Sequence, residues 1–366
     1  MSTPFTKRAL GATALTLALS AVAHAQTSSG QLYTITNAVA GNEVAIFDRA
    51  SNGALTYSHN VATGGVGTGG GLGNQGAVIL TQDERFLLAI NAGSNDLSVF
   101  RVEDQGLTLL DVEPVRGLMP VSVTQHDDVV YVVNAGTSSI SGFRMDFDGQ
   151  LDFMPGSLAR LSAPTTGPAQ VQFGARGQHL YVTEKATNRL TRFDLNASDL
   201  PVSRTSFDSP GATPFGFALG LRGQLIVSEA AGGAAGASTV SSYAQVAGGA
   251  LQTLSASVSA GQTAACWIVA TPDGRIAFST NTADDNVTSF SIGFDGSLTV
   301  LQPIAASTPD APIDMAVTRD GRFLYVLSRN DGTVADYSIG ADGSLAEIPG
   351  GQMVLPTTGT TGLAVR

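Results

Sequence analysis

A repeated pattern constrains the fold of this chain more than any other feature of its sequence. The clearest copy, at 320–345, has an apolar strand, a polar turn, a second strand closing on an aromatic residue, and a glycine-containing turn. The closing aromatics are spaced by 53, 43, 50, 50, 47 and 47 residues, at Phe47, Phe100, Phe143, Phe193, Tyr243, Phe290 and Tyr337. Such a period, with about four short strands in each copy, is typical of propeller blades. The pattern therefore predicts an all-β fold, a seven-bladed β-propeller.

The unbroken repeat also predicts the domain organisation. A length of 366 residues alone would suggest two domains. We instead expect a single propeller domain over 26–366, because the blades bury their faces only against one another. The first blade lacks an inner strand of its own, and the C-terminal segment 360–366 resembles the inner strands of other blades. We predict that this C-terminal strand completes the first blade and joins both ends of the chain in one sheet.

The N-terminus has the pattern of a secretory signal peptide. Lys7 and Arg8 precede an apolar run at 9–22, and a small-x-small cleavage site follows at 23–25. Residues 1–25 are therefore predicted to be removed, which would place the mature protein in the periplasm or outside the cell. An uncleaved membrane anchor is the alternative, although a run of about 14 residues is short for a bilayer span.

Net charge and cysteine content exclude some classes of binding partner and any internal disulfide. Loss of Lys7 and Arg8 with the signal would take the net charge from -11 to -13, which makes nucleic acids and anionic membranes poor partners. Cys266 is the only cysteine, so no internal disulfide can form. We expect a monomer whose partner is a small molecule, uncharged or cationic.

Two glycine-rich segments depart from the repeat. The segment 61–76 lacks the G-K-[ST] of a phosphate-binding loop and no helical pattern follows it, which argues against a nucleotide site. We predict a flexible loop at a face of the ring, with a substrate lid as the alternative. The insertion 230–238 in the fifth blade has little to pack, so we expect a protruding mobile loop.

Equivalent positions of the repeat should converge at one mouth of the central channel. One set follows the YVxN-like strand of each blade: Asn37, Asn91, Asn134, Glu184, Glu229, Asn281 and Ser328. A second set lies near the start of each inner strand: Ala77, Ser122, Gln170, Gly216, Trp267, Asp314 and Gly362. If both sets face one mouth, their deviating members form an acidic pocket with one aromatic wall, suited to a small oxygen-rich ligand. Those members are Glu184, Glu229, Gln170, Trp267 and Asp314.

The same residues could instead have purely structural roles. Asn and Glu at strand ends often satisfy loop backbone groups, and Trp267 can equally be a wedge between blades. No histidine falls at a convergent position, which leaves a histidine-based metal site or a Ser-His-Asp triad without support. No cofactor is required, although a ring of Asn and Glu oxygens could hold a calcium ion.

The repeats resemble the YVTN-type propellers of the lactonase family, which includes bacterial 6-phosphogluconolactonases and fungal carboxymuconate cyclases. The segments 320–345 and 272–301 carry the resemblance, which covers nearly all of the mature chain. Active members tend to have G-P-R-H at an inner strand, then N-E. The matching residues in this chain are Gly167-Pro168-Ala169-Gln170 and Thr183-Glu184. A P-H-x-H segment is matched by PVSV at 120–123. The glutamate is kept, whereas the arginine and histidines are not.

Two functions are compatible with this pattern. The first is an exported lactonase-like hydrolase of a small lactone, with Glu184 or Glu229 as general base, since neighbouring carboxylates can raise one pKa toward neutrality. Asn134, Asn281 and Gln170 would hold the carbonyl, and Trp267 the ring. The second is a non-catalytic binding propeller that holds a ligand or peptide in its funnel. The missing histidines favour binding, and the two acids favour hydrolysis. Export and an acidic pocket disfavour a phosphorylated sugar lactone.

Overall fold

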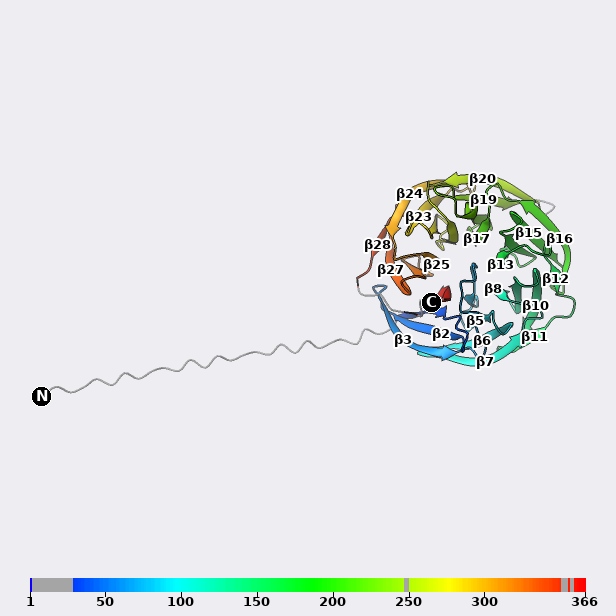
Figure 1. The fold of residues 1–366 in the computed structure, drawn as a ribbon, viewed down its shortest axis with the longest axis horizontal. Coiled ribbons are helices and arrows are strands. Elements are labelled where there is room, and N and C mark those ends of the chain that lie inside the picture. Colours follow the sequence, from blue (N-terminus) through cyan, green and yellow to red (C-terminus); the bar gives the residue numbers. More distant parts are fainter. Residues whose placement is uncertain (2–28, 247–249, 350–354, 356–358) are drawn as a thin grey trace.

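Seven antiparallel sheets form a closed ring in the computed structural model, which describes residues 1, 29–246, 250–349, 355 and 359–366 (Figure 1). Each sheet is one blade, and the strands of a blade run in order from the central channel to the rim. Among the described residues, the only helix is the 3-10 turn η1 (Ala231–Gly233), and none is long and apolar enough to cross a membrane. The predicted seven-bladed, all-β architecture is confirmed. Apart from Met1, the predicted signal peptide lies outside the described residues.

The first three blades are built from residues 30–160 together with the C-terminal strand. From the channel outward, blade one contains β29 (Thr361–Val365), β1 (Gly30–Ile35), β2 (Glu43–Arg49) and β3 (Leu55–Ala62). Blade two contains β4 (Val78–Leu80), β5 (Phe86–Asn91), β6 (Asp96–Glu103) and β7 (Gly106–Pro114). Blade three contains β8 (Pro120–His126), β9 (Val129–Asn134) and β10 (Ser139–Met145), with β11 (Leu151–Phe153) and β12 (Ala159–Arg160) both paired to β10.

Blades four to seven follow the same order. Blade four contains β13 (Pro168–Phe173), β14 (His179–Glu184), β15 (Arg189–Leu195) and β16 (Pro201–Asp208). Blade five contains β17 (Pro214–Leu219), β18 (Leu225–Glu229), β19 (Thr239–Gln245) and β20 (Leu251–Ser259). Blade six contains β21 (Ala265–Ala270), β22 (Ile276–Asn281), β23 (Asn286–Ile292) and β24 (Leu298–Ser307). Blade seven contains β25 (Pro312–Val317), β26 (Phe323–Ser328), β27 (Thr333–Ile339) and β28 (Leu345–Glu347).

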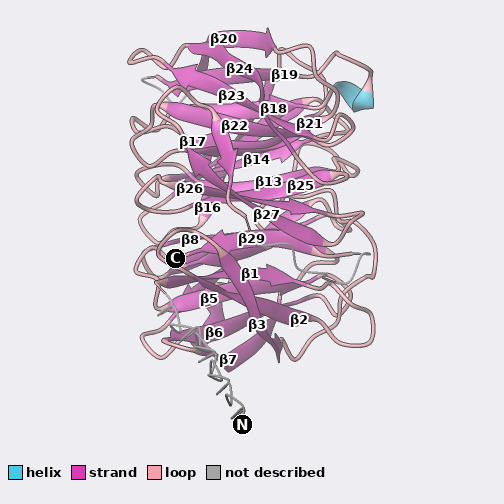
Figure 2. Ribbon diagram, turned by 90° about the vertical axis from the view of Figure 1, so that its left-hand side faces the viewer, coloured by secondary structure: helices cyan, strands magenta, loops and turns pink. Residues whose placement is uncertain are grey.

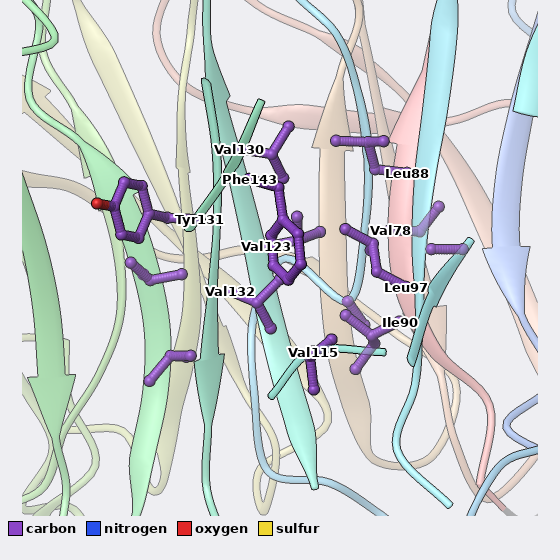
Figure 3. Close-up of a cluster of buried hydrophobic side chains, with 14 of the residues drawn as sticks. Val78, Leu88, Ile90, Leu97, Val115, Val123, Val130, Tyr131, Val132 and Phe143 are labelled. Carbon is purple, nitrogen blue, oxygen red and sulfur yellow. The ribbon is translucent and has the colours of Figure 1, made fainter. Parts of the chain in front are cut away.

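The second strand of each blade is buried on both faces, which explains its composition. β5 (FLLAIN) and β9 (VVYVVN) are buried at every position, because neighbouring blades cover both sides of the sheet. β-Branched and aromatic residues suit such a sandwiched strand. Figure 3 shows Leu88 and Leu97 of blade two facing Val123 and Phe143 of blade three. The hydrophobic core therefore consists of layers between neighbouring blades.

The two ends of the chain meet in blade one. β29 pairs antiparallel with β1, with Leu32 opposite Val365 and Tyr33 opposite Ala364. The predicted C-terminal closure is confirmed. Blade one therefore has no turn between its two innermost strands, and Arg319 of blade seven reaches past it to Glu84 of blade two at 2.7 Å. The ring is thus closed by a strand and by an ion pair.

The insertion in blade five projects from the ring at one face, as the η1 turn in Figure 2 shows. Residues 232–237 are exposed, whereas Ala230 and Ser238 at its ends are buried. The predicted protrusion is confirmed, and its mobility stays a prediction.

Candidate functional site

The central channel contains a cavity of about 540 Å³ lined by the inner strands of all seven blades. At one end the lining residues are buried: Gln75, Gln170 and Asp314 are each less than a tenth exposed. At the other end the lining reaches exposed residues, Gln82 and Ala175, in the turns that follow the inner strands. The cavity is therefore closed at one mouth of the channel and opens toward the other. Its volume falls in the range of small-molecule sites.

The glycine-rich segment closes the first mouth. Gln75 reaches from blade two to blade six, where its side-chain amide donates to the Ile268 carbonyl at 2.8 Å and its Oε1 accepts from the Ile268 N–H at 3.1 Å. A Cβ at Gly216 would lie 1.9 Å from Gln75 Oε1 and 2.9 Å from the Cys266 carbonyl oxygen, so a side chain at this position of blade five would displace Gln75. We call residues 63–76 the plug. The segment predicted as a loop at the ring face instead crosses the channel mouth.

Asn74 connects the plug to blades one, three and six. The Trp267 indole N–H donates to the Asn74 carbonyl at 2.6 Å, and the Thr361 hydroxyl donates to Asn74 Oδ1 at 3.0 Å. The Asn74 side-chain amide donates to the Val121 carbonyl. Glycines let this backbone pass close to the blades, while the polar side chains of Asn74 and Gln75 satisfy inner-strand groups that the channel leaves open.

Asp314 is a carboxyl group at the closed end of the cavity. It is 2 % exposed, and its Oδ1 accepts the Met315 N–H at 2.8 Å. Its Oδ2 has no partner in hydrogen-bonding geometry among the described residues. Burial raises the pKa of Asp314 well above its usual value, because the charged form loses its hydration, and the backbone amides of Met315 and Gly362 offset only part of that rise. A buried acid with a free oxygen and a raised pKa in a cavity is typical of a functional site.

Gln170 lines the same end of the cavity and bridges two blades. Its Nε2 donates to the Phe217 carbonyl at 3.0 Å, and its Oε1 accepts the Phe217 N–H at 2.6 Å. The Nε2 also lies 3.2 Å from Oε1 of Gln172, a second amide in the lining. Of the seven predicted site residues, only Gln170 and Asp314 line this cavity.

Glu184 and Glu229 are fully buried at the ends of β14 and β18, one strand away from the channel. Glu184 Oε1 accepts from the Ser162 N–H at 3.0 Å and the Thr191 hydroxyl at 2.6 Å. Its Oε2 accepts from the hydroxyls of Ser162 and of Thr187. The donors all belong to blade four and to the loop that enters it.

Glu229 has a separate set of donors. Its Oε1 accepts from the Ser209 hydroxyl at 2.8 Å and the Gly211 N–H at 3.0 Å, and its Oε2 accepts from the Thr239 hydroxyl. The two glutamates share none of these partners. Their contacts favour the structural alternative, in which each carboxylate holds its own inter-blade loop. Their catalytic assignment stays a prediction.

The other three predicted ligand-binding residues also contact protein groups. Asn281 donates to Asn286 Oδ1 at 2.7 Å and to the Thr288 hydroxyl at 2.8 Å. Asn134 donates to the Ser141 hydroxyl at 3.2 Å, while its Oδ1 has no partner among the described residues. Neither asparagine lines the cavity, and nor does Trp267.

Trp267 supports the plug. Its ring packs against Phe215 with the centroids 4.8 Å apart, and the side chain is 5 % exposed. Because its N–H is bound to Asn74, the indole acts as a wedge between blade six and the plug. That contact corresponds to the wedge alternative rather than to an aromatic wall of a pocket.

Asn74, Gln75 and Lys185 are polar residues of this mouth that the sequence patterns missed. Lys185 Nζ donates to the Gly73 carbonyl and lies 4.7 Å from the centroid of the Phe215 ring. Burial lowers the pKa of Lys185 to about 8. The sequence signal that could have identified Lys185 is its position directly after Glu184, the last residue of β14.

Metal ligands do not gather at this site. In the part of the chain that the structure describes, no three His, Cys, Asp or Glu side chains lie close enough together to hold one ion.

Comparison with known proteins identifies related sequences and folds. The model of a family described as lactonase, 7-bladed beta-propeller, matches residues 29–160 and 237–355. No curated protein matches the chain. A Bacteroides fragilis protein provisionally named 6-phosphogluconolactonase has 19% identity and a TM-score of 0.74, covering 94% of this chain and 99% of its own. The periplasmic gluconolactonase of Pseudomonas aeruginosa has 16% identity and a TM-score of 0.68, covering 89% and 97%. At such identities the structural likeness shows the fold alone.

Proposed function

Because the chain belongs to the family of seven-bladed β-propeller lactonases, we propose that it hydrolyses a small lactone in the central cavity, beside Asp314. The free Oδ2 of Asp314 carries this proposal, since it is the unpartnered oxygen of a buried acid in the lining. The segments matched by the family model include Asp314 and exclude both Glu184 and Glu229. Asp314 therefore replaces the two glutamates as the proposed acid–base group.

The proposed reaction uses Asp314 twice. Its carboxylate takes a proton from a water molecule as the water oxygen bonds to the lactone carbonyl carbon. The resulting carboxylic acid then returns that proton to the ring oxygen as the C–O bond breaks, which releases a hydroxy acid. A raised pKa makes the ionised carboxylate a better base near neutral pH, and general base catalysis contributes about 10²-fold to 10⁴-fold.

Gln172 is the proposed stabiliser of the developing oxyanion, and Gln170 holds it in place by donating to its Oε1 at 3.2 Å. The Gln172 amide lines the cavity that contains Asp314, and an N–H donor fixed in place before the reaction is the usual means of stabilising such charge. This arrangement uses no metal and no cofactor. The route to the site is the open end of the channel, because the plug closes the other.

Export is part of the proposal. The predicted signal peptide supports it, and the P. aeruginosa neighbour of the same fold is named a periplasmic protein. The proposed location is therefore the periplasm or the exterior of the cell. A soluble substrate outside the cytoplasm is consistent with an uncharged or cationic lactone.

The test compares the purified mature chain with Asp314→Asn on a panel of lactones. Asparagine keeps the Oδ1 acceptor for the Met315 N–H but cannot accept a proton. We expect kcat/KM to fall by about 10²-fold or more. Asp336→Asn is the matched control, since Asp336 is also a buried acid with a raised pKa but does not line the cavity. Full activity in Asp314→Asn would reject the assignment.

The second candidate function is binding without turnover. The saturation of Glu184 and Glu229 by loop donors, together with the absent family histidines, favours it. Under this function, the wild-type protein binds a lactone in calorimetry yet releases no acid over hours of incubation. Measurable acid release that depends on Asp314 would exclude it.

A further inference from the structure

The wall of the cavity is divided by blade into a polar part and an aliphatic part. Inner strands of blades three and four present half-buried amides, Gln125 and Gln172, together with His126. The other five blades present half-buried aliphatic side chains: Ile79, Leu80, Leu219, Val269, Val317 and Val365. The titratable groups in the lining are Asp314 at the closed end and His126 near the open end.

The position of the aliphatic residues along the channel matters as much as their number. Asp314 is the third residue of β25 and Val317 is its last, and strands rise roughly 3.3 Å per residue, so the two are about 10 Å apart along the strand. Leu219, Val269 and Val365 likewise lie at or near the ends of their inner strands. The aliphatic wall therefore extends from the acid toward the open mouth.

We propose that the preferred substrate is a lactone with a short aliphatic chain, its ring beside Asp314 and its chain along the aliphatic wall. This inference rests on the proposed function. Each methylene that leaves water for such a wall strengthens binding about 3-fold to 4-fold. A sugar lactone fits less well, because the half-buried wall of five of the seven blades offers its hydroxyl groups no side-chain hydrogen bond. The polar side chains that these blades add to the lining lie at its two ends, Gln75 and Asp314 at the closed end and Gln82 at the open end.

The experiment measures kcat/KM for γ-butyrolactone, γ-hexalactone, γ-octalactone and glucono-δ-lactone. We expect a rise of about tenfold for every two carbons added to the chain, and glucono-δ-lactone at or below the level of γ-butyrolactone. Leu219→Gln, in the aliphatic wall, should reduce the ratio between γ-octalactone and γ-butyrolactone by about tenfold. Leu221→Gln is the matched control, because Leu221 is 75% exposed in the next turn and outside the lining. It should leave the ratio unchanged.

The outcomes separate the two proposals. Hydrolysis of all four lactones without a dependence on chain length, or a preference for glucono-δ-lactone, overturns the aliphatic substrate while lactone hydrolysis stands. Calorimetry and acid release measured on the wild-type protein with the same four compounds test the converse case. Binding that strengthens with chain length in a wild-type protein that releases no acid supports the aliphatic wall and rejects hydrolysis. Neither binding nor turnover of any of the four overturns both.

Discussion

Lys185 of blade four donates a hydrogen bond to the carbonyl oxygen of Gly73, a residue 112 positions earlier in the plug. The ammonium group lies against the Phe215 ring, so the contact is shielded on one side by an aromatic face. Gly73 has a φ of 58°, a left-handed conformation that glycine adopts without strain. One of the contacts at the closed mouth of the channel is therefore a charge-assisted hydrogen bond from blade four to the plug.

Lys185→Met should loosen the plug while keeping a long unbranched side chain over Phe215. Removing a charge-assisted hydrogen bond costs about 1.5–3 kcal/mol, so amide exchange in residues 63–76 should become about 10-fold to 100-fold faster. Hydrogen exchange resolved to peptides measures this. Arg116→Met, at an exposed arginine paired with Glu113, is the control and should leave the plug unchanged. Unaltered exchange in Lys185→Met would show that Asn74 and Gln75 hold the plug alone.

The same lysine makes stability depend on pH. Burial lowers its pKa from 10.5 to about 8, so the unfolded chain binds more protons than the folded chain between those values. The contribution of Lys185 to the free energy of unfolding should therefore rise as pH increases from 8 to 10.5, by up to about 3 kcal/mol. Urea titrations at about pH 7, 8.5 and 10 check this. Lys185→Met should lack the rise, and an identical pH profile in both proteins would contradict it.

Glu184→Gln should destabilise the protein and leave its chemistry intact. Both oxygens of the carboxylate accept hydrogen bonds, and an amide nitrogen in place of one oxygen opposes a donor, at a cost of about 1–3 kcal/mol. Urea denaturation should show this loss, with kcat/KM per folded molecule within about twofold of the wild type. Glu229→Gln should behave in the same way. A large loss of turnover with unchanged stability in either variant would restore the glutamates as catalytic groups.

The contacts of these glutamates show how much the sequence repeat could predict. Spacing identified seven blades, their inner strands and the closing β29, because the same local pattern recurs in each copy. The alignment also showed that Glu184 and Glu229 are equivalent. The alignment could not show that a residue at the end of the second strand contacts the loop that enters its own blade. Nor could it show that the inner strand separates this residue from the channel.

The plug was harder to predict for a different reason. Glycine-rich composition indicates a permissive backbone, yet the contacts of Asn74 and Gln75 reach residues 47, 193 and 287 positions away. Such partners follow from the closed ring, and no local pattern encodes them. Asp314 and Gln170 were singled out because they break the repeat at inner-strand positions, and both residues line the cavity.

Asp336→Asn should stabilise the protein at neutral and alkaline pH. Asp336 Oδ2 accepts the Leu55 N–H at 3.0 Å, a bond from blade seven to blade one, and its Oδ1 has no partner among the described residues. Burial raises its pKa from 3.8 to about 7, so the folded chain binds more protons than the unfolded chain between those values. The contribution of Asp336 to the free energy of unfolding should therefore fall as pH rises from about 4 through 7.

The asparagine variant keeps an acceptor for Leu55 and has no proton to lose. Its free energy of unfolding should equal that of the wild type near pH 4 and exceed it by about 1–4 kcal/mol at pH 8. Urea titrations at both pH values give the comparison. Asp208→Asn is the control, since Asp208 is 87% exposed, and it should change little at either pH. Equal stability of the Asp336 variant and wild type at pH 8 would contradict the prediction.

Deleting residues 362–366 should open the ring. These residues form most of β29, the inner strand of blade one, and pair with Leu32 and Tyr33 of β1. Without them β1 becomes an unpaired edge, which invites pairing with another chain, and the layers of blades one, two and seven lose their cover. We expect a lower melting temperature by at least about 10 °C and oligomers in size-exclusion chromatography, because several kcal/mol of burial are lost.

A pair of leucine substitutions separates the loss of this strand from the loss of a tail. Leu363 in β29 is 8% exposed, whereas Leu158 in blade three is 52% exposed. Leu363→Asp should reproduce most of the destabilisation, because a charge buried between blades without a partner costs several kcal/mol. Leu158→Asp should shift the melting temperature by no more than about 2 °C. If Leu363→Asp and Leu158→Asp lowered the melting temperature equally, the buried C-terminal strand would stabilise the ring no more than an exposed position does. Closure of the ring would then have to come from the Arg319–Glu84 ion pair.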